Sequence, residues 1–334
     1  MNHLLLLTLL SCIFNPFFTQ RDMKKVQING SAQGTTYHIT YYAKDCVVVK
    51  SQIDSLLNVI DQSLSLYNPN SLINQFNRSN EGLTVDEHFI AVTKAAQSTF
   101  QKTNGLFDIT IGPLTKAWGF GPVKPDSLPG KEMIQSLLPC IDSRLLYWEG
   151  KKLKKKKPCV QLDANGIAQG YSVDQLSLLL EQNGISDYLV ELGGEIRVKG
   201  RKWPEQTKMA VGIEAPSEDL APAAMKKIVW LDKGALTTSG NYRRYRESGG
   251  KYLSHLIDPR TGYPFDNELI SVTMYAPDAI TADAYDNALM GMGLRQAVDF
   301  VEKQPGLGAY FIYRQKDGNI ADSASRIFRS LLQP

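Results

Sequence analysis

Apolar residues recur along this chain with two different periods. In several stretches they return every three or four positions, as they do on one face of an amphipathic helix. We expect helices over about 53–65, 86–103, 170–182, 282–292 and 296–304. Asn-Gly pairs follow the second and third of these stretches, and such pairs are typical of the residues that end a helix.

Other stretches alternate apolar and polar residues or are rich in β-branched and aromatic side chains, which is typical of strands. The first of these covers 35–42. Further strands are expected on both sides of the lysine run and over 188–192, 196–199, 208–214, 227–231, 270–275 and 309–313. Consecutive strands beside separate helices favour an α+β fold with a mixed, largely antiparallel sheet. No clear linker divides the chain, so we expect one elaborated domain over 31–334.

Composition and charge narrow the class of protein. The chain has 334 residues, of which 43% are hydrophobic and 21% charged, enough to bury a sizeable core. Lys and Arg number 37 and Asp and Glu 34, giving a net charge of +3, which argues against a dedicated nucleic-acid binder. We expect the one strongly basic run, 151–157, to be a solvated hairpin turn.

The first residues resemble a processed secretion signal. An apolar run from Leu4 to Leu10 precedes Ser11 and Cys12, and a short apolar stretch before a small residue is typical of such signals. Two apolar residues and a small one before a cysteine resemble the bacterial lipobox. We therefore expect residues 1–11 to be removed, Cys12 to carry lipid and residues 12–30 to form a tether, which implies an extracytoplasmic, periplasmic protein anchored to a membrane. No Lys or Arg precedes the run, and a buried N-terminal segment with a structural cysteine is the alternative.

The remaining cysteines and the histidines do not suggest a metal centre. Cys46, Cys140 and Cys159 are left once Cys12 is set aside, so at most one disulfide can form and at least one thiol stays free. The four histidines show no zinc-ligand spacing, which argues against a structural zinc site.

Six segments are dense in Gly, Asp and hydroxyl residues, whereas the common nucleotide-binding signatures are missing. These segments cover 105–121, 162–174, 191–195, 237–243, 255–262 and 282–289. Taken singly, each could consist of turns and caps, because Asp-Pro, Thr-Gly and Gly-Gly pairs are ordinary loop chemistry.

In this order and spacing the six segments resemble the ApbE family, the FAD:protein FMN transferases. The resemblance runs from about Gly34 to Gly293 and depends most on F-D-x-T-x-G-P-L-x-x-x-W-G-F-G, from Phe107, and H-x-x-D-P-x-T-G, from His255. It implies an α+β, T-fold-like domain that uses FAD and Mg²⁺ to transfer FMN to a Ser or Thr hydroxyl in a flavinylation motif of an acceptor protein, releasing AMP. Extracytoplasmic lipoproteins are common in the family, which agrees with Cys12.

The resemblance also implies a magnesium site. Asp283 and Asn287 are four residues apart on an expected helix, hence on one face, and the backbone carbonyl of Gly166 would be the third ligand. Oxygen ligands of this kind suit Mg²⁺. The family usually has Thr at the position of Asn287, and an amide carbonyl is a reasonable substitute. An exposed polar helix face is the alternative interpretation of the pair.

His255 is the expected catalytic residue, because a neutral imidazole can take a proton from an attacking hydroxyl. A histidine that caps the turn beside Asp258 is the alternative. The residues expected to line FAD are Gln33, Tyr67, Leu106, Phe107, Asp108, Asp163, Gln169 and Leu256. Tyr67 could stack on a ring system or belong to the core. The family usually has Lys at position 169, where Gln can still donate hydrogen bonds.

Two other functions stay open at this point. One is an FAD pyrophosphatase, in which water is the acceptor and the products are FMN and AMP. The other is a non-catalytic FAD-binding lipoprotein, an interpretation that Gln169 and Asn287 keep open because both depart from the family pattern.

Overall fold

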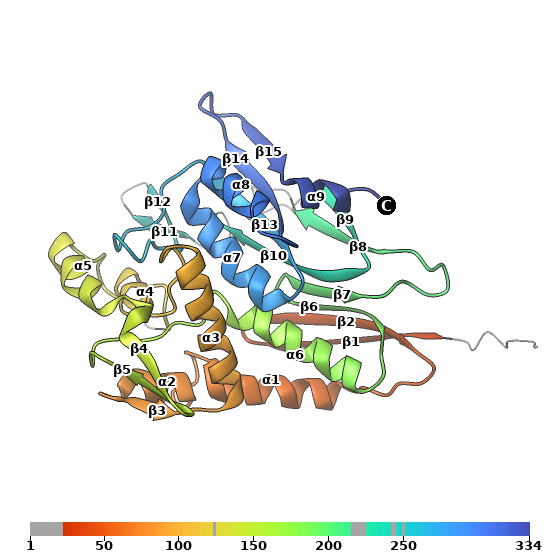
Figure 1. Cartoon of the computed structure of the whole chain (residues 1–334), viewed down its shortest axis with the longest axis horizontal. Helices are drawn as coiled ribbons and strands as arrows, with labels where there is room; N and C mark the ends of the chain where they lie inside the picture. Colours follow the sequence, from red (N-terminus) through yellow and green to blue (C-terminus); the bar gives the residue numbers. More distant parts are fainter. Residues whose placement is uncertain (1–22, 123–124, 215–224, 242–244, 249–250) are drawn as a thin grey trace, which may run out of the picture.

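An antiparallel eight-stranded sheet is the largest element of the computed structural model, which describes residues 23–122, 125–214, 225–241, 245–248 and 251–334. The strand order is β1-β2-β6-β7-β10-β13-β14-β15 (Figure 1). The strands are β1 (Lys24–Ala32), β2 (Thr35–Ala43), β6 (Asp187–Leu192), β7 (Glu195–Lys199), β10 (Lys233–Gly240), β13 (Leu269–Ala276), β14 (Gly308–Arg314) and β15 (Ile320–Ala324). Cys12 and the expected signal lie outside the described residues.

Helices cover one face of this sheet. They are α1 (Lys50–Leu64), α6 (Ala168–Gln182), α7 (Ala279–Met292) and α8 (Leu294–Glu302). Helix α6 packs on β6 and β7, and α7 packs on β10 and β13 and also against α6. The buried apolar side chains of α1 and α6 form a common core with those of β2 and β6. The centre of the sheet is thereby buried beneath α6 and α7.

The opposite face is covered by a hairpin and the last helix. The elements are β8 (Met209–Glu214), β9 (Met225–Leu231) and α9 (Arg326–Leu331). Met209, Val229 and Phe328 are buried in one cluster with Tyr310 and Ile312 of β14. The domain therefore has helices on one face of the sheet and mainly a second, smaller sheet on the other.

A smaller helical region packs beside α7 (Figure 1). It contains α2 (Leu72–Arg78), β3 (Gly82–Thr84), α3 (Glu87–Lys102), α4 (Gly112–Trp118), α5 (Lys131–Leu137), β4 (Leu146–Glu149) and β5 (Lys152–Lys155). Its core includes Phe76, Phe89 and Leu153, which share a cluster with Ala284 and Ala288 of α7. A hairpin of β11 (Tyr245–Ser248) and β12 (Lys251–Ser254) precedes residue 255. Helix α7 is thus packed between the large sheet and the smaller helical region that contains α3.

The main difference from the expected elements is at the start of the chain. The strand expected at 35–42 is β2, but β1 precedes it and pairs with it along its whole length. Residues 24–30, which we assigned to the tether, therefore belong to the sheet. Only Ile28 of β1 is buried, because β1 is an edge strand, and so its sequence carries little hydrophobic pattern.

The lysine run is a second difference. It occupies the β4–β5 hairpin, as expected, but Lys155 is only 5% exposed. Its Nζ donates to the backbone oxygens of Phe76 and Val160 at 3.1 and 2.8 Å. The prediction of a fully solvated turn is wrong for this residue.

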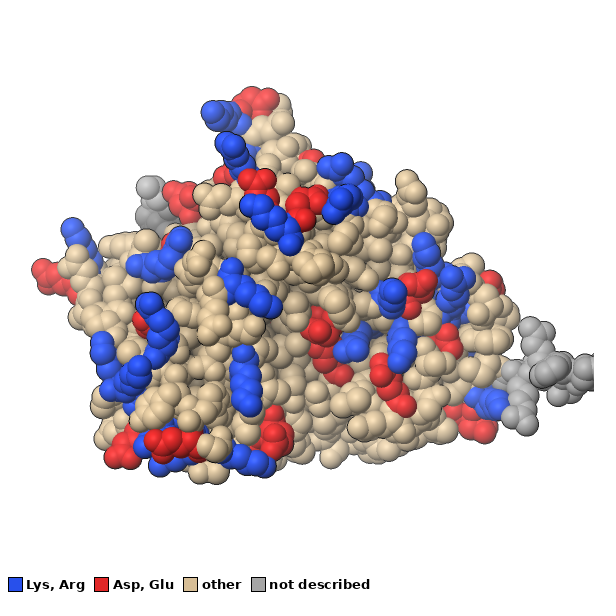
Figure 2. All heavy atoms as spheres, viewed as in Figure 1, with Lys and Arg blue, Asp and Glu red and all other residues tan. Residues whose placement is uncertain are grey.

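The cysteine arithmetic is confirmed. Cys140 and Cys159 form a disulfide with a Cα–Cα distance of 5.6 Å, and Cys46 is free and exposed. None of the helices in the described part of the chain has the length and apolar character needed to cross a membrane. On the face drawn in Figure 2, Lys and Arg are interspersed with Asp and Glu.

Candidate active site

A pocket of about 300 Å³ brings the six Gly- and Asp-rich segments together. Every one of them contributes lining residues, although they are spread over most of the chain. The lining residues lie at 106–120, 163–169, 193–195, 238–240, 255–265 and 283–287. These segments meet because α7, the start of α6 and the end of β10 lie next to one another under the small helical region.

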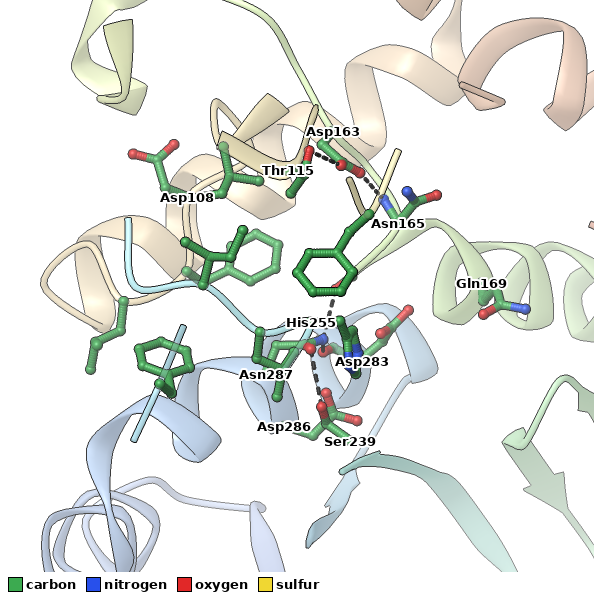
Figure 3. Close-up of a pocket in the computed structure, with 18 of the residues that line it drawn as sticks. Asp108, Thr115, Asp163, Asn165, Gln169, Ser239, His255, Asp283, Asp286 and Asn287 are labelled. Carbon is green, nitrogen blue, oxygen red and sulfur yellow. Dashed lines mark hydrogen bonds between the residues drawn. The ribbon is translucent and has the colours of Figure 1, made fainter. Parts of the chain in front are cut away.

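The three predicted magnesium ligands lie together in this pocket (Figure 3). The Asn287 Nδ2 donates to the backbone oxygens of Gly166 and Asp283 at 3.3 and 2.9 Å. The Asn287 Oδ1 accepts a hydrogen bond from the Ser239 hydroxyl of β10 at 3.1 Å. Asp283 Oδ2 accepts a hydrogen bond from the Gly170 backbone N–H at 2.9 Å. The structure therefore brings the three predicted ligand residues together from the loop before α6 and from one face of α7, with the Asn287 amide nitrogen turned toward the Gly166 carbonyl and the amide oxygen toward Ser239. The Asn287 oxygen would reach a cation beside Gly166 after its amide group rotates.

Within the described part of the chain, no basic side chain offsets the negative charge of the two α7 carboxyl groups in the pocket. Asp283 is 4% exposed, and burial raises its pKa to about 7 against the opposing effect of the Gly170 hydrogen bond. Asp286 lines the same pocket, and burial together with the charge of Asp283 holds its pKa well above the usual range. The charged side chains that act on these two groups are all acidic. A cation at this position would offset the negative charge.

The donor set fits a hard divalent cation. It consists of carboxylate, amide and backbone carbonyl oxygens, which are the ligands that Mg²⁺ prefers. Within the described ranges, no group of three or more His, Cys, Asp or Glu is arranged to hold a metal ion. The described donors alone are thus too few for an octahedral site, which typically takes further oxygens from water and substrate phosphate.

His255 lines the pocket at the end of the β11–β12 hairpin. Its ring meets that of Phe120 edge to face, with 6.3 Å between the centroids. The adjacent turn is closed by Asp258, whose carboxylate accepts two hydrogen bonds from the Arg260 guanidinium at 2.9 and 2.8 Å. Arg260 and the backbone N–H of Gly262 both contribute hydrogen bonds to this turn.

Six of the eight predicted flavin residues line the pocket: Leu106, Phe107, Asp108, Asp163, Gln169 and Leu256. The Asp163 carboxylate is oriented by the Thr115 hydroxyl at 2.8 Å and the Asn165 N–H at 2.9 Å. The Asp108 carboxylate points away from Asp283 in Figure 3 and accepts hydrogen bonds from Thr110 and Ser143. Its carboxylate therefore braces the loop that carries Leu106 and Phe107.

Gln33 and Tyr67 lie outside this pocket. Gln33 sits in the β1–β2 turn with φ +52°, and its amide donates to Ser172 of α6 at 2.9 Å. The side chain of Tyr67 is 64% exposed, so the core alternative for this residue is wrong.

Several pocket residues were not singled out from the sequence. They include Thr115, Phe120, Asn165, Glu195, Ser239, Phe265 and Asp286. Asp286 could have been found, because it is one helical turn after Asp283 and shares its face. Ser239 belongs to a segment that we noted only as dense in hydroxyls, and it proves to lie on β10. No sequence pattern pointed to Phe265, because it lies just after the end of the H-x-x-D-P-x-T-G motif.

Comparison with known proteins identifies the family of this chain. Residues 33–311 match the ApbE family. The chain is 33% identical to the FAD:protein FMN transferase of Haemophilus influenzae over 92% of its length and 91% of the relative's. It is 35% identical to the protein of that name from Escherichia coli K12, over 87% and 84% of the two chains. The flavin transferase ApbE from Vibrio cholerae superposes with a TM-score of 0.83 at 33% identity, covering 93% of this chain and all of that one. The chain therefore belongs to the ApbE family.

Proposed function

We propose that this chain is an FAD:protein FMN transferase, which moves FMN from FAD to a Ser or Thr hydroxyl of an acceptor protein. The observation that carries the proposal is one pocket that holds buried, uncompensated carboxyls, further oxygen donors and a histidine. Relatives at 33% and 35% identity carry the name of this activity. The same pocket contains both family motifs that we quoted from the sequence.

The reaction makes one bond to phosphorus and breaks another. The acceptor hydroxyl oxygen bonds to the FMN-side phosphorus of FAD, and the bond from that phosphorus to the bridging oxygen breaks, so that AMP leaves with the electron pair. His255 takes the proton of the hydroxyl as the new bond forms. Most of the barrier comes from charge and alignment, so the residues act mainly by placing the two groups and balancing charge.

Asp283, Asn287 and the carbonyl of Gly166 would hold the Mg²⁺ ion. When bound, the ion supplies positive charge to the pyrophosphate and to the leaving phosphate. Leu106, Phe107 and Leu256 provide the apolar part of the pocket, which suits a flat ring system. The neutral side chain of Gln169 contributes hydrogen bonding without adding positive charge.

We also propose that the protein acts outside the cytoplasm, anchored by lipid on Cys12. The disulfide between Cys140 and Cys159 supports this, because disulfides persist mainly in oxidising compartments. Replacing Cys12 with Ser should abolish incorporation of a fatty-acid probe, since only a thiol can be acylated in this way. Label that persists in Cys12→Ser, or that is missing from the parent, contradicts the anchor.

Intact-mass spectrometry tests the proposed activity. Purified protein is incubated with FAD, Mg²⁺ and a candidate flavin-carrier domain, and the carrier should gain the mass of a bound FMN while AMP appears. Free AMP with an unmodified carrier identifies a pyrophosphatase instead. Unchanged FAD, across several candidate carriers, identifies a binding protein.

His255 separates catalysis from flavin binding. His255→Ala should slow transfer by at least ~10²-fold, the low end for a lost general base, and leave FAD affinity, measured by fluorescence titration, near the parental value. The parental rate should rise with pH over ~6–7 as the imidazole loses its proton, and this rise should vanish in the variant. His88→Ala is the matched control, because His88 contacts Tyr171 away from the pocket. Parental transfer by a folded His255→Ala protein ends the assignment.

A further inference from the structure

Asp286 is a pocket carboxyl without a role in the site described so far. It lies on α7 one turn after Asp283 and is 2% exposed. Its Oδ1 is fully buried and has no hydrogen-bond partner. Buried polar atoms in proteins nearly always have a partner, so an unpaired carboxylate oxygen that borders a pocket indicates a missing ligand.

Among the described residues, no basic side chain acts on Asp286 to supply the missing positive charge. Its neighbours are Asp283 on the same helix, Thr237 on β10 and Glu195 on β7, and the last two also carry buried side-chain oxygens. Gln169, from α6, is the uncharged amide on the remaining side of the pocket. An isolated pair of buried carboxylates is costly, so the pair has to be stabilised either by protons or by a cation from solution.

We propose that Asp286 is the second carboxylate of the cation site, so that the chain binds a divalent cation in this pocket before FAD arrives. The inference rests on the proposed function, because the ion is the one assigned there to Asp283 and Asn287. Proteins usually hold Mg²⁺ through one or two carboxylates, with further oxygens from water and substrate phosphate. Two carboxylates match the charge of the ion without the substrate.

The position of Asp286 agrees with this role. Residues three and four apart on a helix share one face, so Asp283, Asp286 and Asn287 form a continuous strip along α7. The strip lines the pocket over its whole length and faces Ser239 of β10 at one end (Figure 3). All the donors are hard oxygens, which favour Mg²⁺ or Mn²⁺ over softer ions.

Binding of Mn²⁺ to the full chain without FAD tests the proposal, with the free ion followed by its electron paramagnetic resonance signal. The parent should bind the ion. Asp286→Asn keeps the shape of the side chain, and it should weaken binding by about 10-fold or more, as loss of a supporting group in a metal site does. Asp278→Asn is the matched control, because Asp278 caps the same helix outside the pocket and Asn also caps well. The control should bind Mn²⁺ like the parent.

The fold of each variant is checked by thermal unfolding, and Asp286→Ser replaces Asp286→Asn if the latter does not fold. A folded variant that binds Mn²⁺ as tightly as the parent overturns the inference, as does a parent that binds no Mn²⁺ without FAD. The transfer assay on the same parent preparation tests the proposed function separately. A parent that binds Mn²⁺ through Asp286 but modifies no carrier supports the inference and contradicts the function.

Discussion

Helix α7 has a buried carboxyl group beside its first turn, that of Asp174, and two more within it, those of Asp283 and Asp286. The two places differ in how far the protein itself provides partners for the carboxylates. At the start of the helix, Asp174 of α6 accepts hydrogen bonds from the backbone N–H groups of Ala279 and Ile280, both at 2.9 Å. It also pairs with Arg197 of β7, whose nitrogen lies 2.6 Å away. All three of these hydrogen-bond partners are donors and one is a cation, so the protein itself offsets the charge of Asp174.

Asp283 and Asp286, one to two turns further along, have fewer hydrogen-bond donors and no basic partner among the described residues. A single backbone N–H, that of Gly170, is bonded to Asp283, and one oxygen of Asp286 has none. Gly170 makes this contact possible, since a Cβ at that position would collide with the backbone of Ala279. A buried carboxylate that serves the fold is therefore paired by the chain, whereas one that serves the site is left for a ligand.

The largest effect on stability is expected from substitution of Asp174. Asp174→Ala leaves Arg197 without its partner and two helix N–H groups unbonded. We expect the free energy of unfolding to fall by about 3 kcal/mol, the low end for breaking a buried ion pair. Urea denaturation measures it. An unchanged midpoint and slope of the urea denaturation curve would show that Arg197 and α7 do not depend on Asp174. The contrast between Asp174 and the two pocket carboxylates would then not hold.

Substitution of Asp283, in contrast, should lower the activity of the protein and not its stability. Asp283→Ala removes a carboxylate that the chain does not compensate, so stability without added cation should not decrease. Transfer should fall by at least about 10²-fold, because a catalytic cation contributes several kcal/mol to the transition state. Transfer assays at limiting Mg²⁺ and urea denaturation without the ion check the two halves. Near-parental turnover at limiting Mg²⁺ contradicts the metal assignment.

The sequence predicted the long elements with a strong hydrophobic period, but it missed an edge strand and several short helices. Helices such as α3 and α6, with buried residues at helical spacing, lie within two residues of their expected bounds. Strand β1 and the short helices α2 and α4 were missed. Each of these buries only a few side chains or consists of a couple of turns, so the hydrophobic period is too short to detect.

The site was predictable in composition but not in assembly. The six segments were visible as clusters, and the family motifs placed His255 and Asp283. Which segments meet depends on pairings between distant strands, as when β10 brings Ser239 to Asn287. Asp286 was missed because the family resemblance assigned roles only to Asp283 and Asn287 on this helix, although Asp286 shares their face.

The next smaller effect is on the affinity for Mg²⁺, because a proton and the cation compete for the Asp283 carboxylate. The raised pKa of Asp283, about 7, means that the cation-free folded state holds a proton which the unfolded state releases near its ordinary value. In the cation-free protein, this group therefore lowers stability as pH rises from ~4 to ~7. Bound Mg²⁺ needs the ionised form, so its affinity should be about 10-fold higher at pH 8 than at pH 6. Calorimetric titration at both pH values measures it, and equal affinities would show that Asp283 does not contact the ion.

The smallest effect concerns Lys155, a buried cation that the chain pairs in the same way as it pairs Asp174. Its ammonium group is bonded to two backbone oxygens and lies 4.9 Å from the centroid of the Phe76 ring. Lys155→Met keeps the apolar stem but leaves both oxygens unbonded, which should lower the free energy of unfolding by about 1 kcal/mol. The loss is modest because burial also disfavours the charge, lowering the pKa of Lys155 to about 8.

Lys156→Met, in the next position of the same run, is the matched control and should change stability by less than about 0.5 kcal/mol, as exposed sites do. Urea denaturation of both variants at pH 7 compares them while the ammonium group of Lys155 is mainly charged. Equal midpoints for the two would mean that the Lys155 ammonium adds nothing to the fold. In that case, pairing by the chain would stabilise buried carboxylates such as Asp174 but not buried ammonium groups.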